Sequence, residues 1–246
     1  MSMLVIARNE LRRIFVSPLA WAVLAVVQLI LGFVFINLLI DYVRNQDMGD
    51  QFTGLADYIG GSLYGFATIV LLLVMPLMTM RLISEERRSG SLTLLLSSPA
   101  SLTEIVLGKF LGLGGFMLAL LALLAAMPLA LLPGSALDLG RIAAGLLGLL
   151  LMMMAFGAAG LFVSSLTREP TIAAVGGFGL LLLVWLVQIL SYQEVPFAEV
   201  IGYLSLIAHY EQLRRGVFNT ADVVYYLLFT ALFLWLTVQR LDLERN

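Results

Sequence analysis

Six long apolar runs, none with a formal charge, dominate this chain of 246 residues. They are Leu19–Ile40, Ser62–Met80, Phe110–Leu132, Ile142–Leu166, Thr171–Leu190 and Val223–Val238. A helix needs about 20 mostly apolar residues to cross the hydrocarbon core of a bilayer, and only the last run is marginal by that measure. The runs are continuous rather than alternating, which excludes a β-barrel. The sequence predicts an all-α membrane protein with six transmembrane helices, in one domain covering residues 1–246.

Composition supports a membrane protein and narrows its chemistry. Hydrophobic residues make up 61% of the chain and charged residues 12%, whereas soluble domains carry about 25% charged residues. The chain has no cysteine, which excludes disulfides and thiolate metal sites. We expect no metal, and nucleic acid is not an expected partner. The first apolar run is too long for the core of a cleaved signal peptide.

The distribution of Lys and Arg predicts the orientation, because cytoplasmic loops carry the excess of these residues. With the N-terminus inside, ten basic residues lie inside and four outside. The inner set is Arg8, Arg12, Arg13, Arg81, Arg87, Arg88, Lys109, Arg168, Arg240 and Arg245, and the outer set is Arg44, Arg141, Arg214 and Arg215. Both termini and residues 81–109 are therefore predicted to be cytoplasmic, and residues 191–222 to form an extracytoplasmic loop.

The segment before the first span, residues 1–16, has the pattern of an amphipathic helix. Apolar residues recur at helical spacing at Leu4, Ala7, Leu11 and Ile14, and Arg8, Arg12 and Arg13 supply a basic face. This pattern is typical of a helix lying in the inner membrane interface, and Ser17-Pro18 would end it. The alternative is a frayed cytoplasmic tail.

Residues 81–109 form a polar segment between the second and third apolar runs. Gly90-Ser91 interrupts its charges, Leu92, Leu94, Leu95 and Leu96 follow, and Ser97-Ser98-Pro99 ends the leucine run. Ser101 and Glu104 match a capping box that would begin the next helix. We expect a short cytoplasmic helix with exposed leucines. Such a cluster needs cover, either from a partner protein or from the inner leaflet and neighbouring spans.

The same segment resembles the cytoplasmic loop of ABC type-2 permeases. The matching residues are Glu85-Glu86-Arg87-Arg88, Gly90-Ser91-Leu92, Leu94–Leu96, Ser98-Pro99 and Glu104-Ile105-Val106-Leu107-Gly108-Lys109. The resemblance extends to the topology and covers nearly all of the chain. A second set of segments is similar to the gliding-motility-type branch of that family. These segments are His209-Tyr210-Glu211, Arg215-Gly216-Val217 and Asp222–Tyr226.

The resemblance implies a coupling helix near Ser89–Leu96 that is seated in a separate ATP-hydrolysing subunit. The implied ATPase-coupling residues are Glu85, Glu86, Arg87, Arg88, Gly90, Leu92, Leu94, Leu95 and Leu96. It also implies export of an unidentified substrate across the bacterial cytoplasmic (inner) membrane. Partners would be that ATPase, a second copy or homologous permease, and a companion subunit with an extracytoplasmic domain. Replacing Leu94 and Leu95 with Asp is predicted to detach the ATPase.

The chain itself is not expected to be an enzyme. It has neither G-x-x-x-x-G-K-[ST] nor G-x-G-x-x-G outside its spans, so ATP and Mg²⁺ would bind the partner and no cofactor is expected here. His209, the only histidine, lacks a second His or a Cys for zinc or catalysis and is expected at headgroup level. One alternative function stays open: a membrane anchor that transmits ATPase-driven conformational change to the companion without transport.

Overall fold

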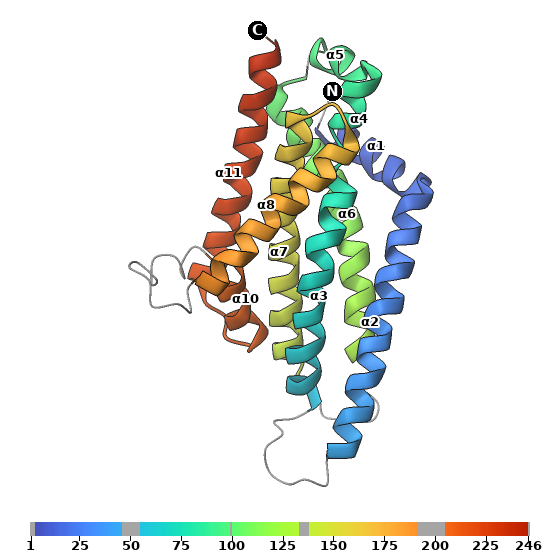
Figure 1. Ribbon diagram of the computed structural model, residues 1–246, viewed down its shortest axis with the longest axis vertical. Coiled ribbons are helices and arrows are strands. Elements are labelled where there is room, and N and C mark those ends of the chain that lie inside the picture. Colours follow the sequence, from blue (N-terminus) through green and yellow to red (C-terminus); the bar gives the residue numbers. More distant parts are fainter. Residues whose placement is uncertain (1–2, 46–54, 99, 133–137, 191–204, 246) are drawn as a thin grey trace.

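The structure is a computed structural model that describes residues 3–45, 55–98, 100–132, 138–190 and 205–245. Within these ranges the chain consists of helices and the turns between them, with no strand. The helices are α1 (Met3–Val16), α2 (Pro18–Asn45), α3 (Leu55–Thr79), α4 (Ser84–Ser89), α5 (Ser91–Leu96), α6 (Leu102–Leu129), α7 (Leu139–Leu166), α8 (Pro170–Leu190), α10 (Leu206–Arg214) and α11 (Thr220–Arg245). They form an elongated bundle with α1, α4, α5 and the C-terminus at one end (Figure 1).

Six of these helices are long and apolar enough to cross a membrane: α2, α3, α6, α7, α8 and α11. They coincide with the six predicted runs, which confirms the all-α membrane fold. The last run looked marginal because α11 continues past Val238 to Arg245 with polar residues. Only the part of a helix that lies in the hydrocarbon layer has to be apolar, so a helix that extends beyond this layer can have a shorter apolar run.

The centre of the bundle is α7, which packs against α3, α6, α8, α10 and α11. Its small residues allow this close approach. A Cβ at Gly160 would overlap the Thr79 side chain on α3, and one at Gly148 would lie 3.0 Å from Tyr210 Cδ2 on α10. Glycine therefore lets the neighbouring helices approach the α7 backbone closely.

The predicted N-terminal helix is present as α1 and ends where Ser17-Pro18 was expected to break it. Its buried residues are Ile6, Glu10 and Ile14, whereas Leu4 is 69% exposed. The helix therefore rests on α6 through these three side chains, and its position in the membrane interface stays a prediction. The turn into α2 is held by Trp21 Nε1, which donates to the Phe15 carbonyl at 2.8 Å.

Part of the predicted extracytoplasmic loop, residues 191–204, lies outside the described residues. The rest contains α10, a nine-residue helix that packs on α7. Tyr210 of α10 donates its hydroxyl hydrogen to the Tyr64 carbonyl of α3 at 3.2 Å. In Figure 1, α10 lies away from the end of the bundle that carries the termini.

Candidate functional site

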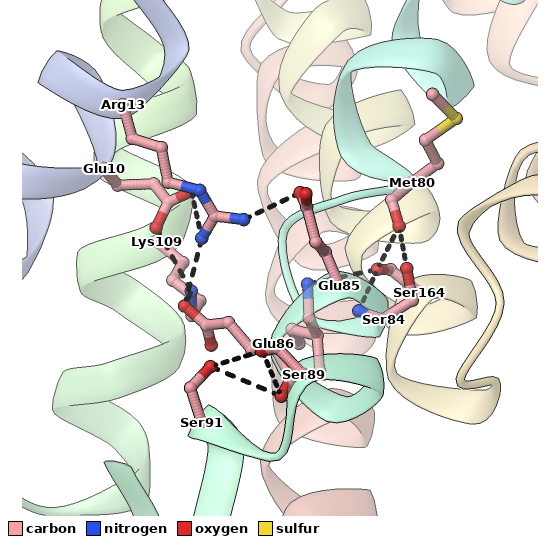
Figure 2. Close-up of polar contacts among 11 residues, drawn as sticks. Glu10, Arg13, Met80, Ser84, Glu85, Glu86, Ser89, Ser91, Lys109 and Ser164 are labelled. Atoms are coloured by element: carbon pink, nitrogen blue, oxygen red, sulfur yellow. Dashed lines mark hydrogen bonds and ion pairs between the residues drawn. The ribbon is translucent and has the colours of Figure 1, made fainter. Parts of the chain in front are cut away.

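The polar segment between α3 and α6 begins with a break in the helix, and α7 stabilises that break. The Ser164 hydroxyl accepts hydrogen bonds from the backbone N–H of Ile83 (3.2 Å) and Ser84 (3.1 Å) and donates to the Met80 carbonyl (2.9 Å). Figure 2 shows this side chain of α7 pointing at the turn. Because helix ends leave backbone groups without partners, one buried serine attaches α4 to the central helix.

Replacing Ser164 with Ala is expected to destabilise the protein by about 1–3 kcal/mol, because it leaves the buried N–H groups of Ile83 and Ser84 without an acceptor. Thermal unfolding of the purified variant measures this loss. Ser165→Ala is the matched control, since the Ser165 hydroxyl bonds only within its own helix, to the Phe162 carbonyl at 2.6 Å. Equal melting temperatures for the two variants would contradict the proposed attachment.

A sharp corner separates α4 from α5, and the two short helices form a hairpin (residues 84–96). Gly90 stands at the corner with φ +75°, a conformation that glycine adopts without steric cost. The Ser89 hydroxyl donates to the Glu86 carbonyl at 3.2 Å and contacts the Ser91 hydroxyl at 2.9 Å. The corner therefore fixes the direction of α5 relative to α4.

The sequence predicted exposed leucines on α5, but only some of them face outward. Leu92 is buried, Leu95 and Leu96 are half-buried, and Leu94 is 75% exposed. Helical periodicity explains the difference, because residues four apart lie on one face and that face, with Leu92 and Leu96, turns toward the protein. Leu94 is thus the large apolar side chain that α5 presents to the outside.

A network of five charged side chains ties α4 to α1 and α6. The ammonium group of Lys109, whose side chain is 2% exposed, lies 3.1 Å from a Glu10 carboxylate oxygen and 2.6 Å from one of Glu86. Arg13 reaches Glu86 at 3.3 Å and Glu85 at 2.9 Å (Figure 2). A lysine this buried is stable as a cation only when such partners compensate it.

The same network controls the charge of Arg13. Burial by itself disfavours the guanidinium, but the carboxylates of Glu10, Glu85 and Glu86 more than offset this, so the pKa of Arg13 is raised above its usual value. An arginine is charged at physiological pH in any environment, and here the three carboxylates stabilise that charge and hold α1 to α4.

The two arginines of α4 are also paired within the chain. Arg87 lies 2.7 Å from Glu244 of α11, and Arg88 lies 3.1 Å from Glu169 in the connection between α7 and α8. The structure therefore brings the predicted residues Glu85, Glu86, Arg87 and Arg88 together with intramolecular partners. Contact of these four with an ATPase stays a prediction.

Sequence reasoning missed the partners of these charges. Glu10 lies 99 positions from Lys109, and nothing local connects them. One signal was available, because Glu10 is the only acidic residue among the first forty. A single carboxylate in a basic, amphipathic segment is a candidate for a specific cationic partner.

His209 is buried within the protein, and its expected position at headgroup level stays a prediction. Its Nδ1 lies 2.6 Å from Asp222 Oδ1 on α11, and its ring stacks on Tyr225 at 4.1 Å between centroids. The structure thus joins residues of α10 and α11 that the sequence analysis had grouped by resemblance. In Figure 1, α10 lies away from the hairpin of α4 and α5.

Among the described residues, no group of three or more His, Cys, Asp or Glu side chains could hold a metal ion. The hairpin combines a glycine corner, one leucine that is mostly exposed, and attachments to α1, α6, α7 and α11. Such a body can transfer a displacement to packed helices.

Comparison with known proteins gives one family. The family described as ABC-2 family transporter protein matches residues 4–242, which is nearly the whole chain. The match includes the six spans, α1 and the hairpin. A comparison with curated proteins finds no match.

Proposed function

Because this chain belongs to the ABC-2 family of transporter proteins, we propose that it is the membrane-spanning permease subunit of a transporter driven by a separate ATPase. The observation that carries the proposal is the hairpin, which exposes Leu94 on α5 while the charged side chains of α4 are paired within the chain. α5 is the coupling helix, and Leu94 enters an apolar pocket of the ATPase.

Movement of α5 reaches the spans through the attachments of α4. Ser164 joins α4 to α7, Lys109 joins it to α6 and α1, and Arg87 joins it to α11. A displacement of the hairpin by the ATPase is therefore shared among helices that pack closely on one another, and packed interfaces shift between discrete arrangements rather than deform continuously. In this proposal Glu85, Glu86, Arg87 and Arg88 hold the hairpin, while Gly90, Leu92, Leu95 and Leu96 shape it.

The proposed orientation places both termini and the hairpin in the cytoplasm of a bacterial cell, with the chain in the inner membrane. Supporting this, α1, the hairpin and the end of α11 share one end of the bundle (Figure 1), and these segments carry half of the Lys and Arg residues, seven of fourteen. Loops rich in Lys and Arg stay inside.

A second permease, identical or homologous, pairs with this one to form the pathway for an exported substrate. α2, α8 and α11 have the least buried span windows of the six. An apolar groove of about 420 Å³ between α2 and α3 is lined by Val23, Val27, Val70 and Val74 among others. These surfaces give the second permease apolar area to cover.

A companion with an extracytoplasmic domain binds the end of the bundle opposite the hairpin. Stimulation of ATP hydrolysis by substrate in the reconstituted complex would favour transport over a purely mechanical anchor.

Replacing Leu94 with Asp is expected to abolish co-purification with the ATPase while insertion and melting temperature stay unchanged, because an exposed side chain contributes little to folding. Leu94 is replaced alone rather than together with Leu95, because Leu95 packs against the core and its replacement by Asp would also affect folding. Affinity purification of the co-expressed subunits measures the loss.

Leu243→Asp is the matched control, because Leu243 is 73% exposed near the end of α11 but lies outside the hairpin. We expect this variant to retain the ATPase. Undiminished recovery of the ATPase with Leu94→Asp would overturn the assignment of α5.

A further inference from the structure

A cavity of about 470 Å³ opens beside the hairpin, between α4, α5, α11 and the end of α7. Its volume falls within the range of small-molecule sites. Its walls combine basic and apolar side chains. The lining residues are Arg87, Leu92, Thr93, Leu96, Leu166, Arg168, Arg240 and Glu244.

The cavity carries an excess of positive charge. Three arginines line it with one carboxylate, Glu244, which lies 2.7 Å from Arg87 and 3.2 Å from Arg240. Within the described part of the chain, no carboxylate lies within ion-pair distance of Arg168. The single carboxylate therefore leaves a net charge of about +2 on the walls, by formal charges at neutral pH.

Arg87 supplies an independent sign that an acceptor is missing. Its side chain is 10% exposed, and its buried Nε has no hydrogen-bond partner within the described residues. A buried donor without an acceptor costs free energy, so such an atom in a cavity wall marks a place where an anion is favourable.

We propose that this cavity binds the phosphate headgroup of an anionic phospholipid from the cytoplasmic leaflet. Guanidinium groups match phosphate oxygens in charge and in fork geometry, and three arginines line this cavity. Basic pockets between spans on the cytoplasmic side are suited to anionic headgroups.

The apolar part of the lining favours a lipid over the carboxylate of a protein partner. Leu166 is the last residue of the span α7, and it is half-exposed at the cavity. Leu96 extends the same apolar wall along α5. A phospholipid joins its phosphate to apolar acyl chains through a glycerol backbone, so it offers an anion to the arginines and apolar carbon to the leucines of the lining.

A bound phosphate would bridge α4 through Arg87, the α7–α8 connection through Arg168 and α11 through Arg240. It would stiffen the attachment of the hairpin to the spans. The binding site itself requires no ATPase, whereas this effect on coupling rests on the proposed function.

The test uses the full-length chain purified in detergent, with native mass spectrometry and thermal unfolding in the presence of phosphatidylglycerol or of phosphatidylcholine with the same acyl chains. We expect retained phosphatidylglycerol and a raised melting temperature with that lipid alone. The double variant Arg168→Gln/Arg240→Gln should bind phosphatidylglycerol about tenfold more weakly or worse. Arg87 stays intact, because its loss would leave Glu244 without its nearest partner.

The double variant Arg44→Gln/Arg215→Gln is the matched control, since it removes the same charge from exposed positions away from the hairpin and should bind phosphatidylglycerol as the wild type does. Equal binding by the cavity variant would overturn the proposal. A rise in melting temperature with inorganic phosphate alone, without a further rise with phosphatidylglycerol, would assign the site to free phosphate and overturn the lipid source.

One further outcome separates this inference from the proposed function. If the cavity variant keeps phosphatidylglycerol but loses the ATPase, the arginines dock on a carboxylate of that partner and the lipid proposal fails, while the coupling assignment stands. If Leu94→Asp keeps the ATPase but the cavity variant loses phosphatidylglycerol, the lipid site stands and the coupling assignment fails.

Discussion

Replacing Lys109 with Met is expected to lower the free energy of unfolding by about 3–5 kcal/mol, the range observed when one partner of a buried ion pair is removed. The side chain of Lys109 is almost fully buried, and its ammonium group contacts Glu10 and Glu86. Met has a similar length and is apolar, so packing is largely kept while two carboxylates lose their nearest cation. Unfolding in detergent, followed by tryptophan fluorescence, measures the change, and the variant is expected to be recovered in lower yield.

A matched control separates burial from the mere loss of a salt bridge. Arg88→Gln removes the pair with Glu169, whose two side chains are both more than half exposed, and exposed pairs contribute about 0–1 kcal/mol. The triple variant Lys109→Met/Glu10→Gln/Glu86→Gln removes the uncompensated charges and should recover part of the lost stability. If Lys109→Met were as stable as Arg88→Gln, the network could not be a structural element of the protein.

The spans, the capping box and the break before α2 could be predicted because each depends on a short stretch of sequence. A bilayer requires a fixed apolar length, and the Ser101–Glu104 capping box, which the structure confirms, involves residues three apart. The break at Ser17-Pro18 follows from the missing N–H of proline. Such features need no knowledge of which helices meet.

The partners of the charged residues could not be predicted, because they come from tertiary packing. Glu85 and Glu86 look like solvated loop residues in the sequence, yet α1 brings Arg13 to them and α6 brings Lys109 to Glu86. The burial of Leu92 has the same origin, since a leucine in a polar loop is covered only if its helix turns that face inward. His209 seemed isolated for a related reason, because its partner Asp222 lies on a different helix.

The close contact between α1 and α6 gives the second large expected effect. A Cβ at Gly112 would lie 2.6 Å from the Glu10 Cβ and 3.0 Å from the Ala7 carbonyl oxygen. Neither atom is the end of a flexible side chain, so α1 has to move as a body. We expect Gly112→Ala to destabilise the protein by about 1–3 kcal/mol and to speed hydrogen exchange in residues 3–16.

Gly114→Ala is the control for this prediction, because no atom lies within 4 Å of the position that its Cβ would occupy. There the change should be neutral or stabilising by up to about 1 kcal/mol, since alanine favours helix more than glycine does. The contrast between two positions on one helix isolates the contact with α1 from helix propensity.

The two large effects should be coupled, because Glu10 both touches Gly112 and pairs with Lys109. Moving α1 should also expose Lys109. Gly112→Ala and Lys109→Met together should therefore destabilise the protein by less than the sum of their separate effects. Additive effects would show that α1 docks on α6 independently of the charge network.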